Sequence, residues 1–288
     1  MKLIRHLIIA SIATASIVST AYAAPTLQFA VGMYQPTKDK NDATYTPLAN
    51  YLSKKLGMPV KLRTVESWEG LAKSLANGET DVALMGPWGY VLANNEAKAQ
   101  AVATIEYEGK PIYYGIMITH PGSGIKSPAD LKGKTFAFAD KGSTSGYLIP
   151  FYYFQKQGIN PDTYFSKVIY TEHPAIEAQV TKGAIDAGAD YNRNRDTMIA
   201  DGLIKASDSQ IIWKSDPLPH DAVAVSEKLF KDKAFVAKLQ SALEGIKNDL
   251  KANPELLPPR YTGFVKSDNT YYKPIRDAGL ATGRLQPK

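Results

Sequence analysis

Short apolar segments of strand character alternate along this chain with segments that carry apolar residues at helical spacing. In the first third, strand-like segments at 26–33, 60–65 and 81–85 enclose helical segments at 45–56 and 68–76. Strands that alternate with helices of about ten residues predict a parallel sheet with right-handed crossovers. The chain is therefore expected to fold as an α/β protein.

A second series of the same kind lies within the first. It begins after a long apolar strand at 112–118 and ends before a return strand at 221–225. One α/β unit inserted in another, with two crossing segments near 113–117 and 221–226, predicts a two-lobed clamshell. Each lobe should hold a mixed, mainly parallel sheet flanked by helices. The remaining expected elements are strands at 135–139, 168–170 and 184–189 and helices at 151–156, 175–182, 231–250 and 271–278.

The crossing strands also set the expected lobe boundaries. We expect lobe 1 to consist of residues 24–115 and 222–288 and lobe 2 to consist of residues 116–221. The cleft between the lobes then collects the carboxyl ends of several strands, which is where open α/β sheets bind ligands. A ligand site is expected in that cleft.

The first 23 residues have the pattern of a secretory signal peptide. Lys2 and Arg5 form a basic start, residues 7–18 are mostly apolar, and residues 21–23 form a small-x-small cleavage site. A membrane anchor is the alternative, but the apolar run is short and is interrupted by Ser and Thr. We expect an exported protein that is cleaved after Ala23.

Cysteine is absent from the sequence, which narrows the chemistry. Its absence excludes disulfides, thiolate metal sites and cysteine nucleophiles. The formal net charge of +6 becomes +4 when Lys2 and Arg5 leave with the signal (6 − 2 = 4), and the other basic residues lie between acids. A mild positive charge helps to attract a small anion, whereas nucleic-acid binding usually requires a clustered basic patch.

Three consecutive hydroxyl residues, Ser143, Thr144 and Ser145, stand between Gly142 and Gly146 where a predicted strand turns into a helix. The first N–H groups of a helix lack intrahelical partners, and the hydroxyl groups add further donors. The glycines allow the backbone to approach a ligand closely. This stretch predicts an oxyanion site, although Ser-Thr-Ser before a helix is also an ordinary N-cap.

Spacing alone indicates no catalytic arrangement. The residue at the centre of a G-x-S-x-G pattern is here Thr144, and no H-E-x-x-H motif occurs. The 4 histidines include no pair at metal-ligand spacing. We expect no catalysis, no metal and no cofactor; a phosphorus-ester hydrolase with a serine nucleophile is the remote alternative.

Four segments resemble the phosphonate-type periplasmic binding proteins that feed ABC importers. In family order they are Gly109–Tyr113, Gly142–Pro150, Glu172-His173 and Trp213–Asp221. The resemblance implies a type II periplasmic binding protein with a hinged cleft, located in the periplasm. It also implies a small oxyanion as ligand and an ABC permease in the inner membrane as partner. We further expect a monomer that binds no nucleic acid.

The resemblance also implies which residues contact the ligand. Tyr113 matches a family position that reaches the ligand from the other lobe, Trp68 falls where the family often has an aromatic residue, and Asp221 matches an acidic cleft residue. The loop after Gly86 is a less specific match, and it adds Trp88 and Tyr90. Each of these aromatic residues can instead belong to the core. The residues expected to hold the oxyanion are Ser143, Thr144, Ser145 and His173.

One position departs from the family pattern. Aminoalkylphosphonate binders place a Glu beside the amine where this chain has Arg193, with Asp190 nearby. This departure, together with the aromatic side chains of Trp68, Trp88 and Tyr113, favours phosphite or hypophosphite ahead of methylphosphonate, with aminoethylphosphonate weak. The alternatives are a binding protein for alkyl- or aminoalkylphosphonates, or for another solute such as a sulfonate, thiamine or an amino acid.

Overall fold

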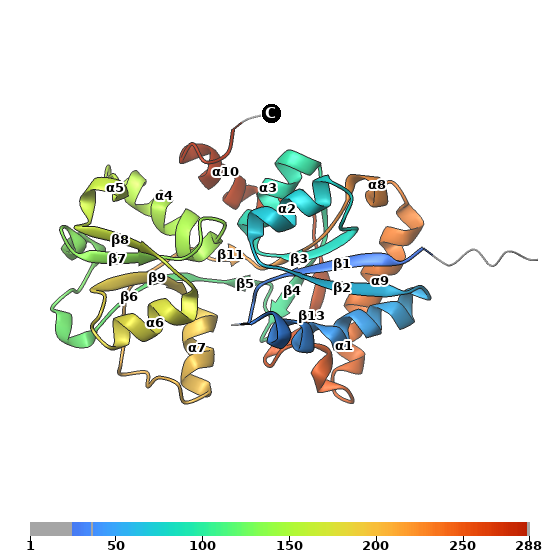
Figure 1. The fold of residues 1–288 in the computed structure, drawn as a ribbon, viewed down its shortest axis with the longest axis horizontal. Coiled ribbons are helices and arrows are strands. Elements are labelled where there is room, and N and C mark those ends of the chain that lie inside the picture. The colour runs from blue at the N-terminus through green and yellow to red at the C-terminus, as the bar shows by residue number, and fades with distance from the viewer. Residues whose placement is uncertain (1–24, 36, 287–288) are drawn as a thin grey trace, which may run out of the picture.

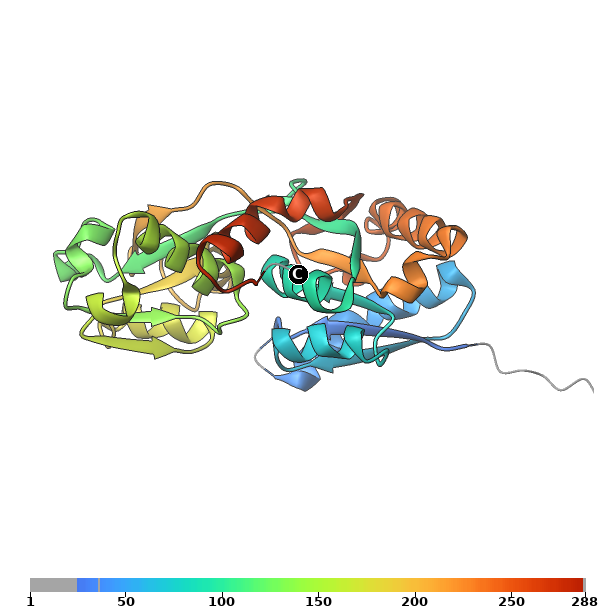
Figure 2. The same cartoon turned by 90° about the horizontal axis from the view of Figure 1, so that it is seen from above.

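The computed structural model of the chain describes residues 25–35 and 37–286. The predicted signal segment and its cleavage site lie outside these residues. The fold contains a six-stranded sheet and a five-stranded sheet, with a two-stranded sheet between them (Figures 1 and 2). We call the part around the six-stranded sheet lobe 1 and the part around the five-stranded sheet lobe 2. In the described part of the chain, no helix is both long enough and apolar enough to cross a membrane.

The sheet of lobe 1 has the strand order β13-β4-β12-β3-β1-β2. β1 is parallel to β2 and to β3, as the alternating pattern predicts, whereas β12 runs antiparallel to β3 and β4. The sheet is therefore mixed. Its strands are β1 (Leu27–Gly32), β2 (Val60–Val65), β3 (Val82–Met85), β4 (Gln100–Tyr107), β12 (Ala222–Val225) and β13 (Tyr261–Lys266).

Helices cover both faces of this sheet. Successive residues of a strand point to opposite faces, so Val31 packs with the helices of one face and Ala30 with those of the other. The first face is covered by α1 (Lys38–Leu56) and α9 (Lys233–Asp249), and the second by α2 (Trp68–Ala76) and α3 (Pro87–Ala97). The short helix α8 (Glu227–Phe230) precedes α9.

Helix α1 begins earlier than the predicted start at residue 45. The side chain of Thr37 caps the helix by accepting the N–H of Lys40. The first turns bury Asn41, which donates hydrogen bonds to the Gly32 carbonyl and the Thr64 hydroxyl at 3.1 and 2.9 Å. Apolar spacing could not reveal these turns, because a polar side chain fills the buried position.

The sheet of lobe 2 has the strand order β10-β6-β9-β7-β8. β7 is parallel to β8 and β9, and β6 is antiparallel to β9 and β10. The strand β10 and the helix α7 were not predicted, because neither shows a clear apolar period. The strands are β6 (Gly115–Thr119), β7 (Thr135–Phe138), β8 (Lys167–Tyr170), β9 (Ala187–Tyr191) and β10 (Gln210–Lys214), and the helices are α4 (Ile149–Lys156), α5 (Pro161–Tyr164), α6 (His173–Thr181) and α7 (Asn192–Ala200).

Three elements of the described structure bridge the lobes, two as crossing strands and one as a helix packed against both. Two are the antiparallel strands β5 (Ile112–Tyr113) and β11 (Leu218–Pro219), close to the predicted crossings. The third is α10 (Lys273–Ala281), which packs against α3 of lobe 1 and α4 of lobe 2 (Figures 1 and 2). Beyond α10, the Arg284 Nε donates a 2.8 Å hydrogen bond to the Tyr147 hydroxyl. The sequence predicted this helix but not its bridging position.

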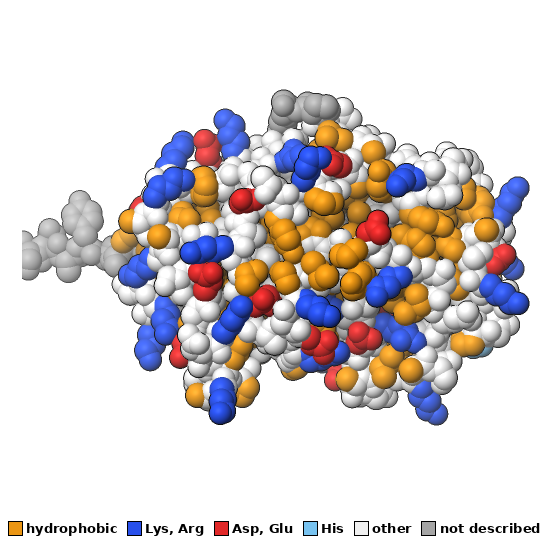
Figure 3. Space-filling view, turned by 180° about the vertical axis from the view of Figure 1, so that it is seen from behind, with side chains coloured by type: hydrophobic (Ala, Val, Ile, Leu, Met, Phe, Trp, Pro, Cys, Tyr) orange, Lys and Arg blue, Asp and Glu red, His pale blue; other side chains and the backbone are white. Residues whose placement is uncertain are grey.

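Short helical turns complete the described structure. They are the 3₁₀ turns Pro121–Ser123, Pro128–Leu131, Pro254–Leu256 and Asn269–Tyr272, and the π-helical turn Thr144–Leu148 that leads into α4. On the surface shown in Figure 3, Lys and Arg side chains lie dispersed among Asp and Glu rather than in one basic patch. That face offers no clustered basic footprint of the kind that nucleic-acid binding uses.

Candidate functional site

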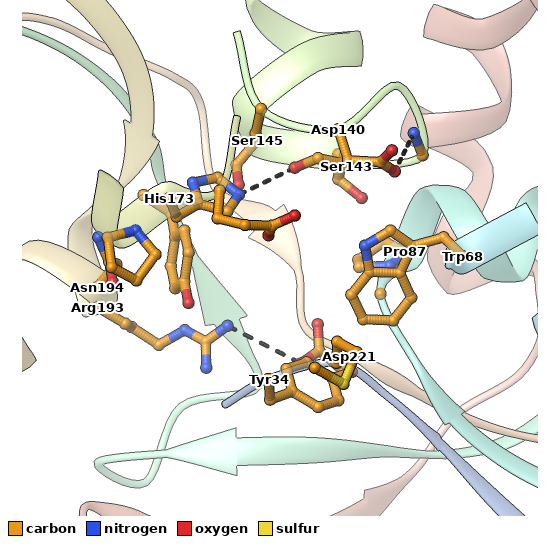
Figure 4. Close-up of a pocket in the computed structure, with 18 of the residues that line it drawn as sticks. Tyr34, Trp68, Pro87, Asp140, Ser143, Ser145, His173, Arg193, Asn194 and Asp221 are labelled. Carbon is orange, nitrogen blue, oxygen red and sulfur yellow. Dashed lines mark hydrogen bonds and ion pairs between the residues drawn. The ribbon is translucent and has the colours of Figure 1, made fainter. Parts of the chain in front are cut away.

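A pocket of ≈ 500 Å³ lies between the lobes. The carboxyl ends of β1, β2 and β3 face it from lobe 1, and those of β7, β8 and β9 face it from lobe 2. This is the position at which open α/β sheets bind ligands. Figure 4 shows side chains from both lobes converging on the pocket, among them Tyr34, Trp68, Ser143, Ser145, His173, Arg193 and Asp221.

The three predicted hydroxyl residues form one wall of this pocket. Ser143 caps the π-helical turn, because its hydroxyl oxygen accepts the N–H of Gly146 at 3.1 Å. Thr144 contacts lobe 1, because its hydroxyl oxygen accepts the backbone N–H of Trp88 at 2.8 Å. Ser145 is buried at the wall, where its side chain lies beside Tyr113. We call residues 142–146 the anion loop.

Replacing Ser145 with alanine should weaken ligand binding and leave the fold stable. A hydrogen bond to a charged group contributes roughly 1.5–3 kcal/mol, so we expect the dissociation constant of a phosphorus oxyanion to rise about tenfold to hundredfold. Calorimetric titration measures the affinity, and thermal melting measures the stability. Ser166→Ala, at an exposed position of lobe 2, is the matched control. Equal affinity in Ser145→Ala and in this control would remove Ser145 from the site.

Behind the anion loop runs a chain of hydrogen bonds that the sequence did not reveal. The His173 Nδ1 donates to the Asp190 carboxylate at 2.8 Å, and its Nε2 lies 3.1 Å from the Ser143 hydroxyl oxygen. The Asn194 amide donates to the second Asp190 oxygen at 2.8 Å. Because Asp190 fixes the proton on Nδ1, a neutral His173 accepts from Ser143, whereas a protonated His173 donates toward an anion. Asp190 therefore orients His173 and does not itself line the pocket.

A second buried carboxyl group, Glu177, lies next to Asp190. Glu177 is fully buried, and its Oε1 accepts a 2.5 Å hydrogen bond from the Ser209 hydroxyl. Burial, followed by the negative charge of Asp190, raises the pKa of Glu177 to about 8. Glu177 therefore stays protonated at neutral pH.

This raised pKa predicts a specific pH dependence of stability. An unfolded Glu loses its proton near pH 4.3, roughly the model-peptide value, whereas folded Glu177 keeps it to about 8. The folded state thus binds more protons between these values, so the free energy of unfolding should fall as the pH rises from about 4.5 to 8. Glu177→Gln should remove most of this fall, which is on the order of a few kcal/mol at roughly 1.4 kcal/mol per pKa unit.

Urea unfolding at several pH values tests the effect. The matched control is Glu255→Gln, because Glu255 is exposed. If the pH profile of Glu177→Gln runs parallel to that of the parent protein, Glu177 is not the protonated group.

Lobe 1 closes the pocket with Trp68, at the start of α2. Its Cβ lies so near the anion loop that a Cβ added at Gly142 would sit 2.6 Å from it. Trp88 and Tyr90, which were also expected at the ligand, do not line the pocket. The Trp88 ring packs against Gly279 of α10, and the Tyr90 ring packs on Tyr272 at 4.6 Å. Both side chains belong to the core of lobe 1, and Trp88 meets the anion loop through its backbone N–H.

Opposite the anion loop, Arg193 and Asp221 form what we call the far pole of the pocket. Arg193, at the start of α7, has its guanidinium carbon 5.1–5.5 Å from the ring centroids of four tyrosines. Asp221 follows β11, and its carboxylate lies 3.9 Å from the Arg193 Nη2. Burial raises the pKa of Asp221, and the Arg193 charge opposes this rise. Tyr113, one of the four tyrosines, lines the pocket and lies beside both Arg193 and the Ser145 side chain.

Sequence reasoning missed several residues that line the pocket. They share one signal, which is that each follows the carboxyl end of a parallel strand. Applied to every predicted strand, that rule would have found them. They are Met33 and Tyr34 after β1, Glu66 after β2, Pro87 after β3, Asp140 after β7, Glu172 after β8, and Asn194 after β9. Within the described residues, no group of three or more His, Asp or Glu side chains could hold a metal ion.

Comparison with known proteins decides the family. Residues 33–272 match the family described as "ABC transporter, phosphonate, periplasmic substrate-binding protein". The chain belongs to this family. The resemblance drawn from the anion loop and its companion segments is thereby confirmed. The family consists of periplasmic substrate-binding proteins of ABC transporters, which sets the class of the chain.

Members of the family with known names or structures are similar to most of the chain. The "phosphonates-binding periplasmic protein" of Escherichia coli (strain K12) is 28% identical over 200 residues, which are 66% of this chain and 59% of that protein. The "probable ABC transporter phosphite binding protein" of Prochlorococcus marinus (strain MIT 9301) is 23% identical over 86% of this chain and 87% of its own length.

A solved structure supports the fold in particular. The Prochlorococcus marinus (MIT 9301) protein PhnD1, in complex with methylphosphonate, superposes with a TM-score of 0.79 at 20% identity. The superposition covers 90% of this chain and 99% of that protein. The expected α/β fold of a type II periplasmic binding protein is confirmed.

Proposed function

We propose that this protein binds an organophosphonate in the pocket between its lobes and delivers it to the membrane permease of an ABC importer. The observation that carries the proposal is the anion loop, with three buried hydroxyl residues and His173 around one wall of the pocket. These groups can surround a tetrahedral oxyanion with charge-assisted hydrogen bonds. The protein then acts as an exported monomer without cofactor, and closure of the lobes on the ligand signals the loaded state.

The size of the pocket favours a phosphonate over the phosphite or hypophosphite expected from the sequence. That expectation rested in part on three aromatic side chains filling the cleft; Trp68 and Tyr113 do line the pocket, but Trp88 packs in the core. A volume of ≈ 500 Å³ falls in the range of pockets that hold drug-sized ligands, roughly 300–1,000 Å³. Phosphite, the ligand named for the Prochlorococcus relative, is the second choice of ligand for the same anion loop.

A hydrolase is the second candidate function. The Ser143–His173–Asp190 chain has the order of groups found in serine hydrolases, with separations of 3.1 and 2.8 Å. The Ser143 oxygen, however, also accepts the N–H of Gly146, which assigns it the role of a helix cap. Steady release of p-nitrophenol from a p-nitrophenyl phosphonate ester, lost in Ser143→Ala, would establish the hydrolase; binding without turnover supports the transport role.

A ligand panel tests the proposed function. We expect phosphonates to raise the melting temperature of the protein, because a ligand that binds only the folded state stabilises it. Sulfate, a tetrahedral oxyanion without phosphorus, is the comparison in the same panel. The panel is methylphosphonate, aminoethylphosphonate, phosphite, hypophosphite, phosphate and sulfate in one buffer. A shift with sulfate but with none of the phosphorus acids would overturn the proposal.

A further inference from the structure

The far pole of the pocket has binding capacity that a ligand's phosphorus group, held at the anion loop, cannot use. Arg193 is only 6% exposed, and its Nε has no hydrogen-bond partner among the described residues. Its Nη1 donates to the Tyr261 hydroxyl, and its other contacts are faces of tyrosine rings. A guanidinium group has five N–H donors, so this buried cation is under-satisfied.

Its pairing with Asp221 is also incomplete. The Arg193 Nη2 lies 3.9 Å from the Asp221 carboxylate, which is beyond hydrogen-bonding distance. Both side chains are more than nine-tenths buried, and both line the pocket. A buried ion pair is stable only where good geometry and additional hydrogen bonds offset the loss of hydration. The loose pair therefore leaves hydrogen-bonding capacity at the Arg193 Nη2 and at the Asp221 carboxylate, which also has the Tyr34 hydroxyl beside it (Figure 4).

The chemistry that complements this pair is a carboxylate next to an ammonium group. A carboxylate matches the fork of Arg193, and an ammonium group matches the oxygens of Asp221. The remaining charged residues of the pocket wall strengthen the assignment, because Glu66, Asp140 and Glu172 are all acidic. A second anionic group of the ligand thus finds its cationic partner at Arg193, and the ammonium group finds its anionic partner at Asp221.

We propose that the ligand is a phosphonate whose tail ends in an α-amino acid, with 2-amino-3-phosphonopropionate as the simplest representative. This inference rests on the proposed function, because it places the phosphonate group at the anion loop. The carboxylate then lies on Arg193 and the ammonium group beside Asp221, with Tyr113 between the two ends of the pocket. Aminoethylphosphonate leaves Arg193 unmatched, and methylphosphonate reaches only the anion loop.

Calorimetric titration of the full chain with four probes tests the proposal. The probes are methylphosphonate, aminoethylphosphonate, 3-phosphonopropionate and 2-amino-3-phosphonopropionate. We expect 2-amino-3-phosphonopropionate to bind at least tenfold more tightly than each of the others. Methylphosphonate or aminoethylphosphonate binding as tightly overturns this inference and leaves the proposed function standing. Failure of all four probes to bind overturns the proposed function as well.

Two variants locate the effect at the far pole. In Arg193→Gln, the ratio of affinities between 2-amino-3-phosphonopropionate and aminoethylphosphonate should fall by about tenfold or more, and in Asp221→Asn the ratio between 2-amino-3-phosphonopropionate and 3-phosphonopropionate should fall likewise. Ratios within one variant do not depend on its stability, so partial unfolding cannot imitate the result. Arg63→Gln is the matched control, because Arg63 forms an exposed ion pair with Glu79. Unchanged ratios in both pocket variants overturn the inference.

Discussion

Replacing Gly146 with alanine is expected to reduce phosphonate affinity at least a hundredfold. A Cβ at this position would lie 2.4 Å from the Ala139 Cβ and 2.5 Å from the His173 Cε1. Neither atom is the end of a flexible chain, so the anion loop and His173 must both move. The change also strains the hydrogen bond from the Gly146 N–H to Ser143. Overpacking of this kind costs roughly 1–3 kcal/mol of stability, and misplaced donors lose most of their interaction with an anion.

Gly245→Ala is the control for this prediction. Gly245 lies in α9, and an added Cβ there would meet only the Tyr51 hydroxyl at an ordinary 3.7 Å. That variant should bind normally and melt no earlier, because alanine favours a helix more than glycine does. Calorimetry provides the affinities and thermal melting the stabilities. Normal phosphonate affinity in a folded Gly146→Ala protein would mean that the anion loop does not hold the ligand.

Replacing Gly142 with alanine should weaken ligand binding by hindering the closure of the two lobes. The new Cβ would lie 2.6 Å from the Trp68 Cβ, which belongs to lobe 1. Gly142 is part of lobe 2, so the overlap with Trp68 occurs only when the lobes are close together. The Asp140 Oδ1 of lobe 2, at 2.9 Å, is the end of a side chain that can turn aside. A clash of roughly 1–3 kcal/mol in the closed state raises the dissociation constant about tenfold to hundredfold. Small-angle scattering should show less compaction of Gly142→Ala than of the parent protein at the same ligand concentration.

The control for Gly142→Ala uses the same tryptophan. A Cβ at Gly89 would meet the Trp68 Cβ at 3.5 Å, an ordinary contact within lobe 1. Gly89→Ala should therefore leave compaction by ligand intact. If Gly142→Ala compacts and binds like the parent protein, the contact between Trp68 and the anion loop is not needed for closure.

Much of the architecture follows from the periodic burial of apolar residues. β1, β3 and β7 are mostly apolar because helices cover both faces of their sheets, so their positions could be predicted. α7 could not, since two of its three buried positions are held by the polar residues Arg193 and Asn194, and Met198 is the single apolar one. The same polar residues belong to the pocket. Local pattern thus failed in a segment where the side chains face a ligand site.

The site was predictable in its anion loop and less so in its walls. The glycines and hydroxyls around Ser143 mark a strand-to-helix turn. Such a turn lies at the carboxyl end of its strand in any arrangement of the other elements. Whether Trp88 points into the pocket or into the core depends on where α3 begins. Pro87 is its first residue, and this register turns the Trp88 ring toward α10. No feature of the sequence indicates that α10 is there to receive it.

The bridging position of α10 determines the direction in which the molecule can open. If β5 and β11 were the sole links, the lobes could bend and also twist about them. α10 adds a third attachment to one side of this pair (Figure 1), through α3 in lobe 1 and α4 in lobe 2. One rotation disturbs the contacts of α10 with α3 and α4 least. Its axis passes through the paired strands β5 and β11 and through α10. Opening about that single axis keeps the two rims of the pocket facing each other in constant register, so a transporter that touches both rims senses their separation alone.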